Sequence, residues 1–155
     1  MSLSTSKKVT VQRFDREPIQ GFISPGAWLT PNGAEVLTSA GNLHVVPYSE
    51  IRWVSFLREF GEDPSLHMRR SFVARPRVNG IWLKLLFRDQ TVLEALIGND
   101  LLQVEQYGLH VQPPDQALRI WVPRAALAAI QVLGVAGSPW RKRAEPTKDQ
   151  GKLFE

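Results

Sequence analysis

The sequence predicts an all-β fold built from two small five-stranded barrels in tandem, and three observations support this prediction. First, the block at residues 46–57 recurs at residues 122–133: both copies begin with Val-Pro and then place apolar residues three positions apart. Second, several segments alternate apolar and polar residues, which is the pattern of half-buried strands. Third, turn residues separate these segments every few positions. Such a repeat constrains the fold more than any single element does.

The first predicted barrel covers residues 8–58. Its first strand, residues 8–13, alternates apolar and polar side chains, and Asp15 lies in the turn that follows. The second strand is Ile19-Gln20-Gly21-Phe22-Ile23, in which Gly21 indicates a bend, a bulge or a close approach of backbone. Strands are also predicted at residues 35–38, 43–46 and 51–57, the last either a full strand or a helical turn followed by a strand.

The second predicted barrel covers residues 80–135 and follows a linker at residues 59–79. Its apolar strand Leu83-Lys84-Leu85-Leu86-Phe87 matches the first strand of the first copy 74 positions earlier. Gly108 matches Gly33 at a shift of 75, and Pro123 matches Pro47 at a shift of 76. Because the register drifts by only two residues over this span, we infer that an ancestral unit was duplicated.

The two ends of the chain differ from the rest in composition. Residues 1–7 are rich in serine and are expected to be disordered. Residues 136–155 contain Trp140-Arg141-Lys142-Arg143 and are expected to form a mobile basic tail.

Composition excludes several classes of protein. No apolar run approaches the roughly 20 residues of a membrane span, and residues 1–8 are polar and lack the apolar core of a secretory signal. We therefore expect a cytoplasmic protein with no membrane partner. The chain has no cysteine, which excludes disulfides, thiolate metal sites and thiol nucleophiles.

The charge of the chain is basic but unevenly distributed. The formal net charge is +4, which favours an anionic partner. Residues 1–139, however, contain 14 lysines and arginines against 12 aspartates and glutamates, so the predicted folded part is nearly balanced. The alternative is that the charge only keeps the protein soluble.

The repeated unit resembles the Sm-like family, and within it the bacterial Hfq type. Val9-Thr10-Val11 through Ile19-Gln20-Gly21-Phe22-Ile23 is similar to the first signature of that family, and residues 43–54 are similar to the second. The resemblance covers residues 9–57 and, more loosely, residues 81–133. It implies SH3-type small barrels and single-stranded RNA binding in a bacterial regulatory role.

The resemblance also implies a position for the RNA contacts. Members of the resembled family place a Lys-His pair just before the last strand, where it helps to hold uridines. Tyr48 and Ser49 occupy that position in the first copy, and Arg124 and Ala125 occupy it in the second. Neither copy keeps the pair. On the resemblance, Tyr48 would stack on a base and Arg124 would meet a phosphate.

The sequence contains no constellation for catalysis, and we expect no enzyme activity, no metal and no cofactor. His44, His67 and His110 lie in different segments without partners at metal-ligand spacing. The aspartates Asp15 and Asp89 occupy matching positions, but Asp in such turns usually accepts hydrogen bonds from backbone N–H groups.

The predicted RNA-binding residues include arginines that could contact phosphates and two aromatic rings that could stack on bases. They are Tyr48, Arg52, Arg69, Arg70, Phe72 and Arg124. The alternative for the linker residues is a solvated segment with Phe72 docked on a barrel. The alternative for the whole protein is a protein-interaction or scaffolding module that binds no nucleic acid.

The barrels are also expected to associate. Each barrel leaves strand edges that favour pairing with a neighbour. Three two-barrel chains would close a pseudo-hexameric ring, and a dimer is the alternative.

Overall fold

The structure is a computed structural model, and it describes residues 5–137. The described chain is all-β, as the sequence predicts, and its sheets are antiparallel. The strands are β1 (Lys7–Arg13), β2 (Ile19–Ile23), β3 (Leu29–Thr30), β4 (Gly33–Thr38), β5 (Leu43–Val46), β6 (Ile51–Leu57), β7 (Gly80–Phe87), β8 (Val92–Ile97), β9 (Gly108–Val111), β10 (Arg119–Pro123) and β11 (Leu127–Ala136). The 3₁₀ turns η2 (Tyr48–Glu50), η3 (Pro64–His67), η4 (Leu101–Gln103) and η5 (Arg124–Ala126) lie between them.

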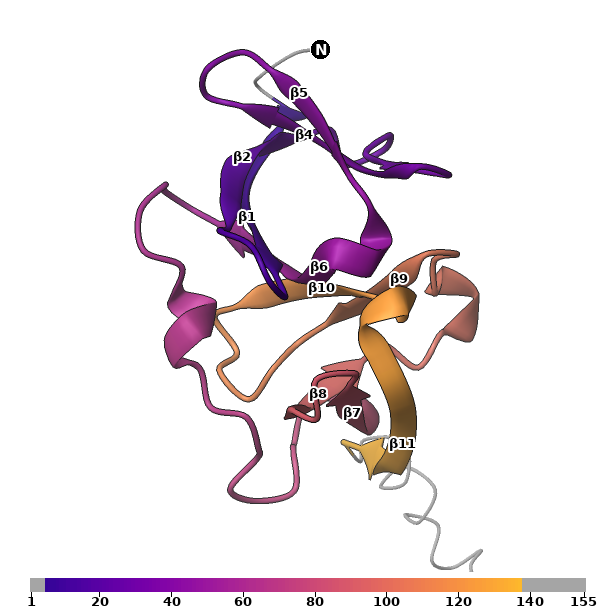
Figure 1. Cartoon of the computed structure of the whole chain (residues 1–155). Helices are drawn as coiled ribbons and strands as arrows, with labels where there is room; N and C mark the ends of the chain where they lie inside the picture. Colours follow the sequence, from indigo (N-terminus) through magenta and orange to yellow (C-terminus); the bar gives the residue numbers. More distant parts are fainter. Residues whose placement is uncertain (1–4, 138–155) are drawn as a thin grey trace, which may run out of the picture.

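The strands form two sheets. One has the order β3-β4-β2-β1-β6-β10-β9 with β5 also paired to β4, and the other has the order β11-β7-β8. Figure 1 shows β1, β2, β4, β5 and β6 curving around a common centre, with β10 alongside β6. The pairing within the described residues does not close either sheet into a barrel.

The strand pairing repeats residue by residue in the two halves of the chain. Val9 pairs with Gly21 between β1 and β2, and Leu83 pairs with Ala95 between β7 and β8, 74 positions later in both strands. Phe22 pairs with Leu37 between β2 and β4. The equivalent residues, Leu96 of β8 and Gln112 directly after β9, form an isolated antiparallel bridge.

The remaining pairs of strands also have the same register in the two halves, so residues that face each other in one half are equivalent to residues that face each other in the other. Glu35 faces Val45 between β4 and β5, as His110 faces Trp121 between β9 and β10. Val11 faces Val54 between β1 and β6, as Leu85 faces Ile130 between β7 and β11. The first half therefore runs β5-β4-β2-β1-β6 and the second runs β10-β9-β8-β7-β11, with matching registers.

The two halves are joined by direct pairing of β6 with β10. Arg119 faces Phe56, Ile120 faces Ser55 and Trp121 faces Val54 in this seam. The last strand of the first half thus pairs with the fourth strand of the second, and one continuous sheet crosses from half to half.

Each half has its own core, and each core receives a tryptophan from the other half. Trp121 of β10 belongs to the core of the first half, where its ring lies edge-on to Trp28 with centroids 5.0 Å apart. Trp53 of β6 belongs to the core of the second half, where it packs against Phe87 at 5.7 Å. Both tryptophans are fully buried. This exchange arises because side chains alternate across the shared sheet.

Gly21 shows the close backbone approach that its place in the sequence indicates. A Cβ built on Gly21 would lie 2.5 Å from the carbonyl oxygen of Leu37 on the neighbouring strand. No side chain fits at that distance, so β2 and β4 approach here only because residue 21 has none.

The predicted linker, residues 59–79, is attached to the seam rather than free of it. Asp63 caps η3 by accepting a hydrogen bond from the backbone N–H of Ser65 at 2.9 Å. The Ser65 hydroxyl in turn accepts from Trp53 Nε1 at 2.8 Å, and Met68 is buried in the second core. The segment therefore covers the side of β6 that faces the second half.

The predicted terminal segments fall partly outside the described residues. β1 begins at Lys7, within the predicted disordered segment, and β11 ends at Ala136, within the predicted tail. Trp140-Arg141-Lys142-Arg143 lies outside the described residues. None of the described residues forms a helix long and apolar enough to cross a membrane.

Replacing Trp121 by alanine should lower the free energy of unfolding by about 3–5 kcal/mol, the usual cost of removing a buried aromatic side chain. Because the ring lies in one half and its strand belongs to the other, both halves should be destabilised. Urea unfolding followed by circular dichroism measures the change, and Leu102→Ala at an exposed site is the control. A loss under 1 kcal/mol would contradict the role of the ring.

Candidate functional site

The six residues predicted to bind RNA do not form a single site. Tyr48 and Arg124 lie on the 3₁₀ turns η2 and η5, next to the seam. Arg52 and Arg70 lie together over Trp53. Arg69 is exposed, and Phe72 packs on the second half.

Tyr48 is held by contacts within the protein. Its ring stacks on Tyr107 with centroids 4.9 Å apart and an interplanar angle of 17°. Its hydroxyl donates to the carbonyl oxygen of Thr30 at 2.6 Å. Burial, together with the neighbouring Tyr107, raises the pKa of Tyr48 to about 12. One face of the ring is therefore already occupied by a ring from the second half.

Arg124 occupies the equivalent place in the second half and is exposed. Its guanidinium donates to the carbonyl oxygen of Glu105 at 3.5 Å, and its backbone N–H donates to that of Tyr107 at 2.8 Å. The turn is thus fixed to the segment before β9, although Arg124 as a whole is exposed.

Arg52 and Arg70 form the one cluster that the structure makes from the predicted residues. Both guanidinium groups lie against the Trp53 ring, at 4.9 Å and 5.3 Å from its centroid. Arg52 Nη2 forms an ion pair with Asp89 Oδ2 at 3.3 Å and donates to Thr91 Oγ1 at 2.9 Å. Arg52 Nε is buried without a hydrogen-bond partner among the described residues.

The charges of this cluster are not balanced. Burial and the nearby Arg52 charge lower the pKa of Arg70. Burial alone would raise the pKa of Asp89, but hydrogen bonds from Thr91 and the charge of Arg52 hold it below its ordinary value. One carboxylate thus faces two guanidinium groups, which leaves a local positive charge beside β6.

Phe72 is docked, as the alternative interpretation of the linker predicts. Its ring lies edge-on to Trp82 with centroids 6.2 Å apart, and its backbone N–H donates to Glu94 Oε1 at 3.1 Å. Trp82 Nε1 donates to the same carboxylate oxygen at 3.2 Å. Residues 71–74 form no strand.

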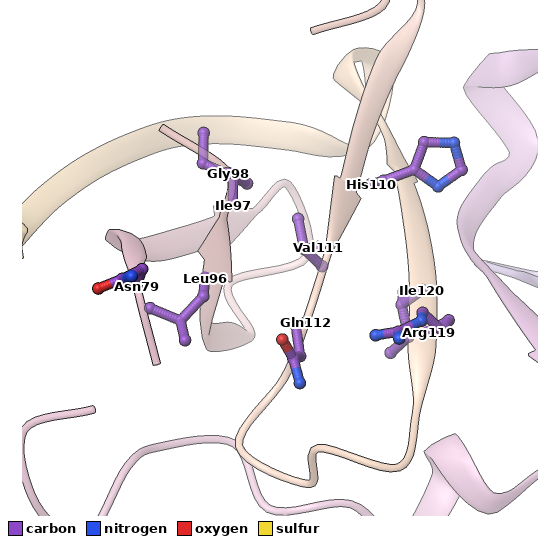
Figure 2. Close-up of a pocket in the computed structure, with 9 residues that line it drawn as sticks. All are labelled: Asn79, Leu96, Ile97, Gly98, His110, Val111, Gln112, Arg119 and Ile120. Atoms are coloured by element: carbon purple, nitrogen blue, oxygen red, sulfur yellow. The ribbon is translucent and has the colours of Figure 1, made fainter. Parts of the chain in front are cut away.

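A pocket of about 250 Å³ lies beside the bridge between Leu96 of β8 and Gln112, and both residues line it. Figure 2 shows the residues around it, which come from β8, β9 and β10 and from the turn before β7. Its polar lining consists of Asn79, His110, Gln112 and Arg119. These side chains include no carboxylate, hydroxyl or amine, so the pocket offers neither a paired-carboxylate site nor a nucleophile with its base.

The strands β5 and β11 have open edges that the candidate residues chosen from the sequence do not indicate. β11 pairs only with β7, and β5 pairs only with β4, so each presents an unpaired edge within the described residues. Large apolar side chains are exposed on both: Leu43 (58%) and Val45 (44%) on β5, and Ile130 (48%), Val132 (63%) and Val135 (60%) on β11. Residues 127–137 contain no charged side chain at all.

Residues 5–134 match the model of a family of unknown function, DUF6982. The chain belongs to this family. No curated protein and no solved structure matches it.

The three histidines of this DUF6982 chain lie in different segments. His67 Nε2 lies 2.7 Å from Glu62 Oε2, and His110 Nε2 lies 3.4 Å from Glu105 Oε1. His44 is exposed on β5. Within residues 5–137, no group of three potential ligands is placed to hold a metal ion.

Replacing Asp89 by asparagine should destabilise the protein near neutral pH by about 1 kcal/mol, the upper part of the range for partly exposed ion pairs. Because its folded-state pKa is lowered, the carboxylate contributes stability above its unfolded pKa and loses it as pH falls through the folded value. The difference between the two proteins should therefore shrink between pH 6 and pH 3.

Urea unfolding of both proteins across that pH range measures the effect. The same substitution in an Arg52→Leu background is the control, and there it should cost less because one partner is already gone. An unchanged difference at pH 3 would exclude the carboxylate as its source.

Proposed function

We propose that this DUF6982 chain is a non-enzymatic protein-interaction module of two tandem Sm-like, SH3-type barrels, which binds an extended polypeptide at the open edge of β11. The observation that carries the proposal is the ten-residue, uncharged edge of β11 with three exposed apolar side chains. The repeated strand path and the two separate cores support the two-barrel description.

An edge of this kind has a physical cost unless something covers it. Edge strands carry unpaired backbone N–H and C=O groups, and most proteins protect them with charged residues, proline or bulges. β11 has no charged residue and no proline, and its two pairing irregularities, between Leu127 and Ala129 and between Val132 and Gly134, leave residues 129–132 regularly paired. An added strand would satisfy the backbone groups and cover the apolar side chains, which is strand addition as seen in several peptide-binding domains.

The partner that fits is an extended segment with alternating apolar residues. Side chains alternate between the two faces of a strand, and Ile130 and Val132 lie two positions apart. Apolar residues at the same spacing on the added strand would lie opposite them.

Single-stranded RNA binding is the second candidate, and one observation favours it. Arg52 and Arg70 share a single carboxylate over Trp53, and the exposed Arg69 is adjacent in sequence. Phosphates would balance the excess charge. Tyr48 and Phe72 contribute less to this candidate, because both rings are already packed in the protein.

A synthetic peptide of alternating valine and threonine should slow amide hydrogen exchange in β11 by at least tenfold, because pairing protects the outward-facing N–H groups. The protein used should carry Leu43→Lys and Val45→Lys, which block the β5 edge and leave β11 open. A peptide N-methylated at alternate residues is the control, because it lacks the required donors. Equal exchange rates with and without the unmodified peptide would refute strand binding at β11.

Titration with oligo-U and oligo-A at two salt concentrations tests the RNA candidate. Phosphate binding should weaken steeply with added salt, and Arg69→Glu should weaken it further. Arg16→Glu, at an exposed site on the first half, is the charge-matched control. If neither oligonucleotide binds at low salt, the RNA candidate is wrong.

A further inference from the structure

The two open edges are related by the repeat to the two strands that form the seam. β11 is the equivalent of β6, because Leu85 faces Ile130 as Val11 faces Val54. β5 is the equivalent of β10, because Glu35 faces Val45 as His110 faces Trp121. The pairing β6–β10 within one chain therefore has a counterpart, β11–β5, whose two strands both lie at sheet edges.

The seam predicts the register of that counterpart. Trp121 faces Val54 and Arg119 faces Phe56 between β10 and β6. The residues equivalent to Trp121 and Val54 are Val45 and Ile130, which would therefore face each other. The residues equivalent to Arg119 and Phe56 are Leu43 and Val132, which would also face each other. The transferred register thus places the exposed apolar residues of one edge directly opposite those of the other.

We propose that the strand bound by β11 is β5 of a second copy of this chain, so that copies join head to tail in the register Leu43–Val132, His44–Gln131 and Val45–Ile130. This proposal rests on the proposed function and names its partner. Because the two edges differ, the contact is heterologous, and successive copies either close a ring or extend as a filament.

The contact between copies should be weaker than the seam inside the chain. The seam buries Trp121 and Trp53, whereas their equivalents at the open edges are Val45 and Ala129. A tryptophan buries far more apolar surface than valine or alanine. Assembly should therefore be reversible and depend on protein concentration.

The far end of β11 does not take part in this register. The carbonyl oxygen of Val135 accepts a hydrogen bond from Arg75 Nη2 at 2.5 Å. The pairing of β11 with β7 is irregular between Val132 and Gly134. Both features limit the added pairing to the part of the strand before Gly134.

Two edge-blocked variants and their mixture test the proposal in analytical ultracentrifugation. One carries Leu43→Lys and Val45→Lys, and the other carries Ile130→Lys and Val132→Lys. Wild-type mass should rise with concentration beyond two chains, and each variant alone should remain a single chain. The equimolar mixture should stop at two chains, since it retains one open β5 and one open β11. Val73→Lys with Leu102→Lys adds the same charge at exposed sites and should assemble as wild type does.

A crosslinking experiment covers the case in which a lysine variant fails to fold. The chain has no cysteine, so Val45→Cys with Ile130→Cys provides the only thiols. Oxidation by oxidised glutathione should give a ladder of covalent multimers from the double variant. Each single-cysteine variant should give no more than traces of a covalent dimer.

Three results would overturn the proposal. They are a wild-type chain that stays monomeric at millimolar concentration, a single edge-blocked variant that still dimerises, and a mixture no heavier than its components. If copies fail to associate while β11 still binds the valine–threonine peptide, this proposal fails and the proposed function stands. If neither a copy nor the peptide binds, both fail.

Discussion

The structure depends on the backbone pairing of β6 with β10 and on the two tryptophans that flank it. Each half alone is a small unit of about 50 residues, a size at which burial is marginal for stability. The seam adds a buried Trp53 to one core and a buried Trp121 to the other. Because each ring is fixed to a strand of the opposite half, neither core is complete without the other half. The stability of the protein is thus shared across the seam.

The same seam explains the surface of the molecule. In a duplicated chain, the last strand of the first unit pairs with the fourth strand of the second unit. The fourth strand of the first unit and the last strand of the second unit then have no partner on their outer edges. Here those strands are β5 and β11, and both expose apolar side chains. The pairing of β6 with β10 inside one chain is therefore the model for a pairing of β11 with β5 between chains.

The duplication could be predicted from the sequence because its signals are local. Glycine, proline and apolar residues recur at shifts of 74 to 76, and the strand registers follow the same shifts. The constraint at Gly21 could be predicted for the same reason. The seam could not be predicted, because it depends on which strand edges meet. The sequence of residues 51–57 does not specify β10 as the strand that pairs with them.

The candidate RNA site was harder to predict, because residue type does not reveal burial. The sequence suggests Tyr48 as a ring on which a base could stack, but Tyr107, far along the chain, already covers one face of that ring. Phe72 suggested another, but it packs on Trp82. Only Arg52 and Arg70 come together, and they do so over Trp53, a residue of the seam.

Native-state hydrogen exchange tests the central claim most directly, because it measures the opening free energy of each strand separately. We predict that the slowest amides of β1, β6, β7 and β10 exchange with one shared opening free energy, equal to that of global unfolding. Two distinct opening free energies, one for residues 7–57 and another for residues 80–136, would show that the halves unfold independently and would contradict the account.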